Sequence, residues 1–435
     1  MNWNVIVRVG DNDTYMPSAT GEDARFFVDF YRPNSPWKMR QNILFDLTKN
    51  EIISASAHDL LVLAMAVSAA DRCIERKFAE DAWQREITIH LPVINPELWA
   101  ENRDLLEKSL AFLSGDNWHF LFRRSLVCRQ FYSNPNESGN ICLFSGGADS
   151  LVGAIDLLSE ERRTSFVGQY GGGVTHKFQE NLENELKKQY PKLCNFSFHY
   201  IEPPHINECT YEPSTRVRSF LFLSLATAYG STSQNTTNLY VPENGLISLN
   251  VPLTESRTGS LSTKTTHPYF ITLYNELINN IGINVKLLSP YKFKTKGQMF
   301  LECKNQALLK DIAKKTMSCS HPEYARLKKI SPKTHCGRCF PCIVRRAAFF
   351  KAGLSDAPYM VDVLNAPPGA NTKCGSDYRA IMMGVTRFKS SPTYSDLFKV
   401  TSTGPIASEE VSEFVDVYRR GMNEISQYLT GSVRV

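Results

Sequence analysis

The sequence predicts an α/β protein built around a parallel β-sheet, and three observations carry that expectation. From Asn140 onward, short apolar strands alternate with helices, which is typical of a parallel sheet covered by helices on both faces. The chain has 435 residues, which is too long for one ordinary domain and predicts about three. Hydrophobic residues make up 42% of the chain and charged residues 21%, a composition that excludes a largely disordered protein.

The first 132 residues predict an α+β domain. Alternating polar and apolar positions indicate strands, an apolar stripe indicates one helix, and Asn95 followed by Pro96 is a typical start for a second helix. The expected elements are a strand at 4–9, a helix at 59–77, a strand at 85–93 and a helix from 95 to 113. No catalytic motif is visible here, so we expect an accessory domain.

The rest of the chain divides into a polar linker, a core and a tail. The segment SNPNESGN at 133–140 has the composition of an interdomain linker. The core elements expected after it are strands at 140–144, 165–170, 195–201, 239–242 and 284–288, and helices at 149–161, 176–190 and 217–229. Two further helices are expected in the tail, at 377–388 and 408–429.

Composition and charge exclude several functional classes. The longest strongly apolar run, Leu60 to Ala70, is too short to span a bilayer, and the N-terminus lacks the apolar region of a signal peptide. The net charge of +5 comes without a long basic run, which argues against direct nucleic-acid binding. We therefore expect a cytoplasmic protein that binds no membrane.

The most informative motif is Ser145-Gly146-Gly147-Ala148-Asp149-Ser150, between the apolar strand ICLF and a helix. Open α/β sheets bind ligands at such strand–helix turns, and glycines let the backbone approach a ligand closely. The amides and dipole of a helix N-terminus favour an anion such as phosphate. Asp149 would repel phosphate directly, so we expect it to act through Mg²⁺. The plain structural alternative is a capped helix start.

This loop resembles the SGGxDS loop of the N-type ATP pyrophosphatases, the PP-loop superfamily, whereas GxxxxGK[ST] and GxGxxG motifs are absent from the sequence. The resemblance implies an adenine nucleotide alpha hydrolase-like core that binds ATP with Mg²⁺ and transfers AMP with release of pyrophosphate. Residues 145–150 would hold the β- and γ-phosphates. The loop alone does not choose among NAD synthetase, GMP synthetase, asparagine synthetase, tRNA lysidine synthetase, tRNA thiolases and QueC.

Four of the 11 cysteines crowd together, at Cys319, Cys336, Cys339 and Cys342. The CxxCxxC spacing lets three sulfurs converge from one tight loop, and four thiolates are what a closed structural Zn²⁺ site requires. The same spacing also suits a [4Fe–4S] cluster. A third alternative is four ordinary buried cysteines, which such crowding argues against. The sequence favours zinc.

Three further segments are similar to QueC, the 7-cyano-7-deazaguanine synthase family. CGRCFPCIVRRAAF at 336–349 resembles its CGxCxxCxxR segment, and SFLFLSLA, preceded by Arg218, resembles its RNxxFLSLA helix. Ser289-Pro290 with Thr295-Lys296 resembles TPL…SK, in which the lysine lies near the phosphates. The resemblance implies a QueC-like domain at 141–350 with the four-cysteine site at 319–342, flanked by the N-terminal domain 1–132, the linker and a helical extension at 351–435. That architecture is similar to the QatC proteins of Qat anti-phage systems and to QueC-like proteins of certain CBASS operons.

The substrate side departs from QueC. Its YGQRH segment becomes YGGGVTH at 170–176, and its acidic, tyrosine-containing segment is replaced by PENGLISLNVPL at 242–253 and GSLSTKTTHP at 259–268. ATP activation is therefore implied more securely than the identity of the acceptor. His176, Arg218 and Lys296 also have plain structural explanations, as a helix-surface residue, a cap of buried carbonyls and a solvated charge.

The resemblance implies an adenylation mechanism. Adenine would lie near the end of the second core strand, so the residues expected to bind the cofactor beyond the loop are Gln169, Tyr170 and His176. The residues expected to be catalytic are Asp149, Lys296 and Arg218. A substrate carboxylate, expected to be 7-carboxy-7-deazaguanine, would form an acyl-adenylate that a nitrogen nucleophile then attacks.

Two other functions stay open. A tRNA-modifying adenylase, thiolating or lysidine-forming, needs a basic RNA-facing surface, against which the near-neutral charge argues. A nucleotide-sensing partner-binding protein without chemistry would not need the intact loop. The regions flanking the core suit a docking surface, so we expect a partner protein from the same defence operon, similar to QatB, to supply the acceptor amine. The alternative is that these regions stabilise a dimer.

Overall fold

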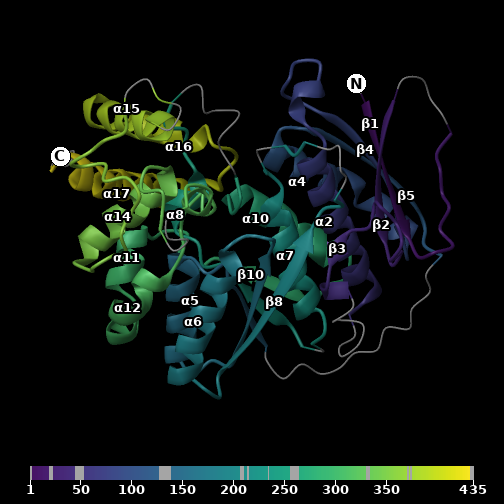
Figure 1. Ribbon diagram of the computed structural model, residues 1–435, viewed down its shortest axis with the longest axis horizontal. Helices are drawn as coiled ribbons and strands as arrows, with labels where there is room; N and C mark the ends of the chain where they lie inside the picture. Colours follow the sequence, from purple (N-terminus) through teal and green to yellow (C-terminus); the bar gives the residue numbers. More distant parts are fainter. Residues whose placement is uncertain are drawn as a thin grey trace.

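The computed structural model describes residues 2–18, 23–44, 53–126, 139–205, 210–212, 215–233, 235–254, 264–329, 334–369, 372 and 375–431. It contains two β-sheets with helices between and around them (Figure 1). Within these residues, no helix is both long and apolar enough to cross a membrane. The predicted linker at 133–140 lies outside the described residues except for its last two positions.

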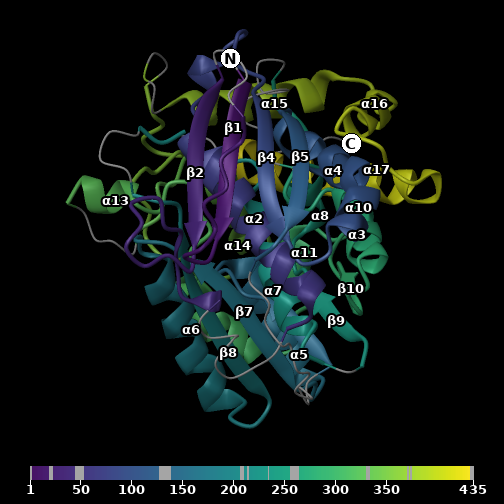
Figure 2. The same ribbon diagram turned by 90° about the vertical axis from the view of Figure 1, so that its right-hand side faces the viewer.

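The N-terminal unit contains a four-stranded sheet in the order β2-β1-β4-β5, seen face-on in Figure 2. Its strands are β1 Asn2–Val9, β2 Ala24–Phe30, β4 Glu86–Val93 and β5 Asn117–Arg124. Every pair is parallel. The expected α+β class is therefore wrong for this unit, because parallel neighbours require crossover connections and make it an α/β unit. Strands β2 and β5 were not predicted.

The second sheet has six strands in the order β10-β9-β6-β7-β8-β3. Five of them are parallel and confirm the predicted sheet: β6 Asn140–Leu143, β7 Thr164–Tyr170, β8 Cys194–Glu202, β9 Thr237–Tyr240 and β10 Val285–Leu288. The short strand β3, Arg40–Gln41, comes from the N-terminal unit and pairs antiparallel with β8. The N-terminal unit thus extends the edge of the second sheet.

Helices cover both faces of the second sheet. On the face toward the N-terminal unit lie α7 Arg218–Gly230 and α10 Pro268–Asn280, and the N-terminal unit adds α2 Ala55–Cys73, α3 Pro96–Glu101 and α4 Arg103–Ser114. On the opposite face lie α5 Ala148–Ser159, α6 Thr175–Gln189, α11 Lys296–Leu301 and α12 Gln306–Ile312. Shorter helices are α8 Gly245–Leu249 and α13 Tyr324–Leu327.

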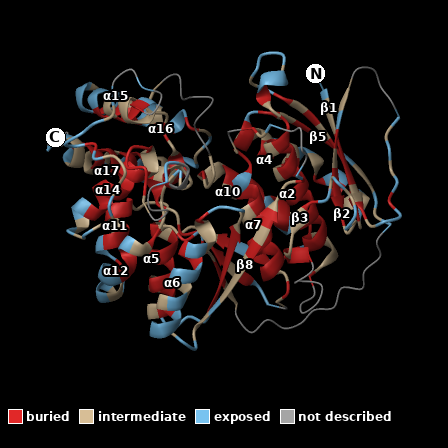
Figure 3. Ribbon diagram, viewed as in Figure 1, coloured by how far each residue is buried: buried red, intermediate tan, exposed pale blue. Residues whose placement is uncertain are grey.

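The hydrophobic core is continuous between the two sheets. Buried residues of β1, β4 and α2 belong to one cluster with those of α7, α10 and β9. Helix α2 packs directly against α7, and both are buried on nearly every side (Figure 3). Burial of apolar surface on this scale is the main stabilising contribution to the fold. The N-terminal unit is therefore fixed against the second sheet through α7.

The C-terminal part is helical, as predicted, and packs on the core. Its helices are α14 Phe340–Ala352, α15 Ser376–Ser390, α16 Ser395–Thr401 and α17 Val411–Thr430. Helix α17 is amphipathic, and its buried residues recur at helical spacing, for example Phe414, Val417 and Tyr418. It packs against α8, α11 and α14, so the tail covers the helices that follow the second sheet.

Candidate functional site

The phosphate loop, residues 145–150, joins the end of β6 to the first turn of α5. Gly146 has a φ of +80°, a conformation that residues with a side chain rarely adopt. Gly147 is the N-cap of α5, and its carbonyl accepts the Ser150 hydroxyl at 2.9 Å, while its N–H donates to Ser145 Oγ at 3.3 Å. The strand–turn–helix arrangement predicted for this motif is therefore present, with the helix N-terminus at its end.

The strand order places this loop at a switch point of the sheet. From β6 the chain proceeds to β7 and β8 on one side, and it returns to place β9 on the other side of β6. In open α/β sheets the ligand site lies in the crevice at the carboxyl ends of such a strand pair. Residues 145–150 follow β6, and residues 241–244 follow β9. These two segments therefore face each other across the crevice.

A cavity of about 420 Å³ occupies this crevice. Predicted site residues that line it are Ser145, Gly147, Ala148, Asp149, Ser150, Arg218, Lys296 and Cys319. Residues from the end of β9, from α7 and from the segment before the cysteine cluster complete its wall. The volume is within the range typical of small-molecule sites. The structure therefore brings the loop, both predicted cationic residues and one metal-ligand candidate to one cavity.

Asp149 is held by two partners from distant parts of the chain. Lys296 Nζ lies 2.5 Å from its Oδ1, and Asn244 Nδ2 donates to its Oδ2 at 2.7 Å. Lys296 is only 5% exposed and is the first residue of α11, whose N-cap Thr295 forms a capping box with Gln298. The predicted solvated charge is thus wrong for Lys296, because burial and the carboxylate fix its ammonium group beside the phosphate loop.

Helix α17 supports Lys296 from the far side. Thr295 Oγ1 donates to Glu424 Oε1 at 2.6 Å, and a Cβ added at Gly297 would lie 2.7 Å from Glu424 Oε2. Burial raises the pKa of Glu424, although the Thr295 hydroxyl opposes the rise. The C-terminal extension therefore packs directly against the residues on both sides of Lys296.

Glu243 adds a second carboxylate to the cavity. It accepts hydrogen bonds from the hydroxyls of Thr266 and, at 3.4 Å, Thr265. Burial raises its pKa, and the negative charge of Asp149 contributes to the rise. Two carboxylates near one phosphate loop form an oxygen-rich environment of the kind that Mg²⁺ prefers.

Arg218 lies on the opposite wall, at the start of α7. Its guanidinium lies over the Phe222 ring, 5.1 Å from the centroid, and the residue is exposed to the cavity. Among the described residues, no carboxylate forms an ion pair with it. A guanidinium without a carboxylate partner in a cavity beside a phosphate loop is suited to bind an anion.

The four predicted metal ligands converge. The Sγ atoms of Cys319, Cys336, Cys339 and Cys342 all lie within 4.8 Å of one another. Two of the separations are 4.0 Å, between Cys319 and Cys339, and 3.8 Å, between Cys336 and Cys342. Zinc–sulfur bonds of about 2.3 Å in a tetrahedron require sulfur separations of about 3.8 Å. The cluster can therefore hold one metal ion and is compatible with zinc.

The cysteine cluster is joined to the phosphate loop through residues 317–319. The Met317 N–H donates to the Gly146 carbonyl at 2.9 Å, and the Ala148 N–H donates to Ser318 Oγ at 3.1 Å. On its other side, the Ser318 N–H donates to His335 Nε2 at 3.1 Å. Burial lowers the pKa of His335 to about 3, so its ring stays neutral and can accept this bond. The loop and the cluster thus share one rigid connection.

Three predicted cofactor-binding residues lie apart from the cavity wall. The side chain of Gln169 donates to the Ile201 carbonyl at 2.9 Å and is buried within the sheet. Tyr170 and His176 stack on each other with ring centroids 3.9 Å apart, and His176 Nε2 lies 3.3 Å from Glu180 Oε1. The cavity is lined at this point by Thr175 instead. Gly146 also lies behind the lining, where its backbone closes the loop.

Sequence reasoning missed several residues of the site, among them Phe222, Glu243, Asn244, Thr265, Thr266 and Ser318. A usable signal existed for Glu243 and Asn244, because polar residues directly after a parallel strand lie at the ligand-binding edge of the sheet. Ser318 could have been noticed as the neighbour of a predicted metal ligand. Of the altered substrate segment 259–268, residues 259–263 lie outside the described residues.

No protein-family model and no curated protein matches this chain. Among solved structures, the chain is matched to one described as the "adenylation, ketoreductase, and pseudo Asub multidomain structure of a keto acid-selecting NRPS module". The identity is 11% and the TM-score 0.23, over 66% of this chain and 33% of that one. The chain thus spans about a third of that protein's length. At this TM-score the match carries no argument about fold or function.

Proposed function

We propose that this protein is an ATP-dependent adenylating enzyme with a PP-loop, QueC-like core. The observation that carries the proposal is the cavity at the β6–β9 switch point, where the SGGADS loop, Lys296 and Arg218 meet. A glycine-rich loop at a helix N-terminus, with two cationic side chains around it, suits a nucleotide polyphosphate. Two carboxylates, Asp149 and Glu243, suit the Mg²⁺ that accompanies ATP.

The chain's own residues divide the work of the first step. A carboxylate oxygen of the substrate attacks the α-phosphorus, the bond to the β-phosphate oxygen breaks, and pyrophosphate leaves with the electron pair. Amides of the first turn of α5 and the hydroxyls of Ser145 and Ser150 hold the departing phosphates. Lys296, released from Asp149 when a metal ion takes that carboxylate, places its ammonium charge beside them. Mg²⁺ bound at Asp149 would supply charge neutralisation on the phosphates.

The second step transfers the acyl group to nitrogen. An amine attacks the acyl carbon, the carbon–oxygen bond to AMP breaks, and the amine loses a proton. The substrate class proposed is a 7-deazaguanine carboxylate, which rests on the resemblance to QueC. The four cysteines serve a structural purpose in this proposal, since four protein thiolates on one ion leave no position for substrate.

Pyrophosphate release measures the first step. Purified protein incubated with ATP, Mg²⁺ and 7-carboxy-7-deazaguanine should release pyrophosphate and form AMP, and mass spectrometry should detect the amide or nitrile product when an amine is present. Absence of both ATP binding and pyrophosphate release would contradict the proposal. Stoichiometric retention of RNA through purification, with RNA-dependent release of pyrophosphate, would favour a tRNA-modifying enzyme instead.

We further propose that the acceptor is an amine of a partner protein in an anti-phage operon. The N-terminal unit and the C-terminal helices both pack on the core that holds the cavity, and they offer additional surface around it. Intact mass of the neighbouring operon protein, co-expressed with wild type or with Asp149→Asn, tests this. A mass increase that depends on Asp149 supports it; identical masses with free product would contradict it.

A further inference from the structure

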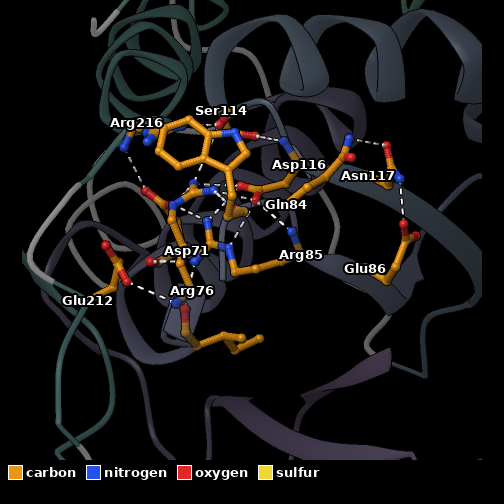
Figure 4. Close-up of polar contacts among 12 residues, drawn as sticks. Asp71, Arg76, Gln84, Arg85, Glu86, Ser114, Asp116, Asn117, Glu212 and Arg216 are labelled. Atoms are coloured by element: carbon orange, nitrogen blue, oxygen red, sulfur yellow. Dashed lines mark hydrogen bonds and ion pairs between the residues drawn. The ribbon is translucent and has the colours of Figure 1, made fainter. Parts of the chain in front are cut away.

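A buried network of charged side chains joins the N-terminal unit to the segment that leads into α7 (Figure 4). Its acidic members are Asp71, Asp116 and Glu212, and its basic members are Arg76, Arg85 and Arg216, all of them buried. The three negative and three positive charges balance. Removing one partner from such a network leaves an uncompensated buried charge, so its members fix one another's positions.

Asp116 and Asp71 anchor the network in the N-terminal unit. Arg85 Nη2 lies 2.7 Å from Asp116 Oδ2 and 2.6 Å from Asp71 Oδ1, and Arg76 Nη2 donates to Asp116 Oδ2 at 2.7 Å. Burial disfavours the charge of Asp116, but hydrogen bonds and charge from Arg85 and Arg76 outweigh it and hold its pKa below the usual range. The arginines therefore keep one oxygen of Asp71 fixed.

The other oxygen of Asp71 reaches the second unit. Asp71 Oδ2 accepts the backbone N–H of Arg216 at 2.9 Å and that of Val217 at 3.3 Å. Helix α7 begins at the next residue, and its own N-cap, Val217, provides no side-chain cap. Orphan amides at a helix start are normally satisfied by a nearby acceptor. For α7, this acceptor comes from a residue 145 positions earlier in the chain.

The helix start fixed in this way forms a wall of the cavity. Arg218, Ser219, Phe222 and Leu223 of α7 line it. The Arg216 side chain strengthens the anchor, since its Nη1 donates to the Ser114 carbonyl at 2.8 Å and its guanidinium lies over the Trp83 ring. Neither Asp71 nor Arg216 lines the cavity, so both act on it through the helix.

We propose that Asp71 is a positioning residue for Arg218, and that the N-terminal unit thereby forms part of the nucleotide site. Asp71 holds the first turn of α7, and the first turn holds the Arg218 guanidinium where it meets a phosphate oxygen of bound ATP. The assignment of ATP as ligand rests on the proposed function, whereas the positioning of α7 by Asp71 does not.

Two measurements on the full-length protein test the inference, with Asp71→Asn as the variant and Glu212→Gln as the matched control. Both substitutions remove one buried carboxylate from the network. Glu212 accepts the Arg76 N–H at 3.0 Å and caps no amide at the start of α7. Hydrogen exchange of the peptide 215–223 without ligand should accelerate at least about tenfold in Asp71→Asn and stay near the wild-type rate in Glu212→Gln.

The second measurement is calorimetric binding of ATP with Mg²⁺. Asp71→Asn should weaken binding about tenfold and Glu212→Gln less than about twofold, which corresponds to about 1.4 and 0.4 kcal/mol. The double variant Asp71→Asn/Arg218→Gln should bind no more weakly than Arg218→Gln alone, because Asp71 acts through Arg218. Additive losses, or equal losses in Asp71→Asn and Glu212→Gln, would overturn the inference.

The exchange result separates this inference from the proposed function. If wild type fails to bind ATP, the proposed function fails, and acceleration confined to Asp71→Asn still supports positioning of α7 by Asp71. If exchange in 215–223 is unchanged in Asp71→Asn, the positioning inference is wrong even where wild type binds ATP.

Discussion

The two parallel sheets of this protein treat the carboxyl ends of their strands in opposite ways. At the end of β1 in the four-stranded sheet, Asp13 turns back, accepts the Val9 N–H at 2.9 Å and binds Arg123 Nη2 at 2.6 Å. Arg32 Nη1 covers the Asp13 carbonyl at 2.6 Å. At the end of β6 in the six-stranded sheet, a glycine loop opens into the cavity instead.

The difference lies in which groups satisfy the strand end. In the first sheet, the polar groups after β1 find partners within the unit, and Asp13 is only 1% exposed. In the second sheet, the chain passes directly into α5, so amides of a helix start, two carboxylates and an arginine are left facing a cavity. Equal strand geometry therefore supports a structural role in one place and a ligand site in the other.

The largest effect expected is that of Asp149→Asn. The variant loses the charge that holds Lys296 and that would hold Mg²⁺, so pyrophosphate release should fall at least about 100-fold. Thermal unfolding should change little, since Asn can still accept from Asn244. Stopped assays of pyrophosphate and AMP measure the effect, and activity within twofold of wild type would remove Asp149 from the mechanism.

Metal removal should disturb the second sheet's site alone. One zinc ion per chain is expected, and Cys339→Ser should lose it, destabilise the C-terminal half by several kcal/mol and abolish ATP binding through residues 317–319. The control is Cys303→Ala, at a buried cysteine outside the cluster whose pKa is raised to about 12 by burial, so it remains a thiol. Elemental analysis that finds iron with labile sulfide, or no metal, would contradict the zinc assignment.

Asp13→Asn tests the first sheet in the same way that Asp149→Asn tests the second. The variant weakens the hydrogen bond from Arg123 and should lower the free energy of unfolding by about 2 kcal/mol. Pyrophosphate release per folded molecule should stay at the wild-type level. Urea unfolding and the assay together decide the matter; a loss of activity without a loss of stability would assign a ligand site to the first sheet as well.

The smallest effect is expected at the Tyr170–His176 stack, which lies beside the cavity but outside its lining. His176→Asn removes the stacked ring and the contact with Glu180, and it should change the rate of pyrophosphate release less than about twofold. Thr175→Val, at a residue that does line the cavity, is the comparison variant. A tenfold loss in His176→Asn would restore His176 to the cofactor site.

The sequence by itself determined the features that depend on neighbouring residues. The strand–SGGADS–helix motif, the alternation of strands and helices after Asn140 and the convergence of Cys336, Cys339 and Cys342 follow from short-range spacing, which the backbone translates directly into local geometry. The amphipathic pattern of α17 belongs to the same class, since helical periodicity identifies its buried face without knowledge of what covers it.

Only the tertiary structure decided which distant residues meet. The order β10-β9-β6-β7 brings Asn244 to Asp149, α11 brings Lys296 to the same carboxylate, and α2 brings Asp71 to the start of α7. The parallel pairing of the N-terminal strands, which reversed the expected class of that unit, was fixed in the same way. Hydrophobic periodicity states which face of an element is buried, but the packing partner depends on the path of the whole chain.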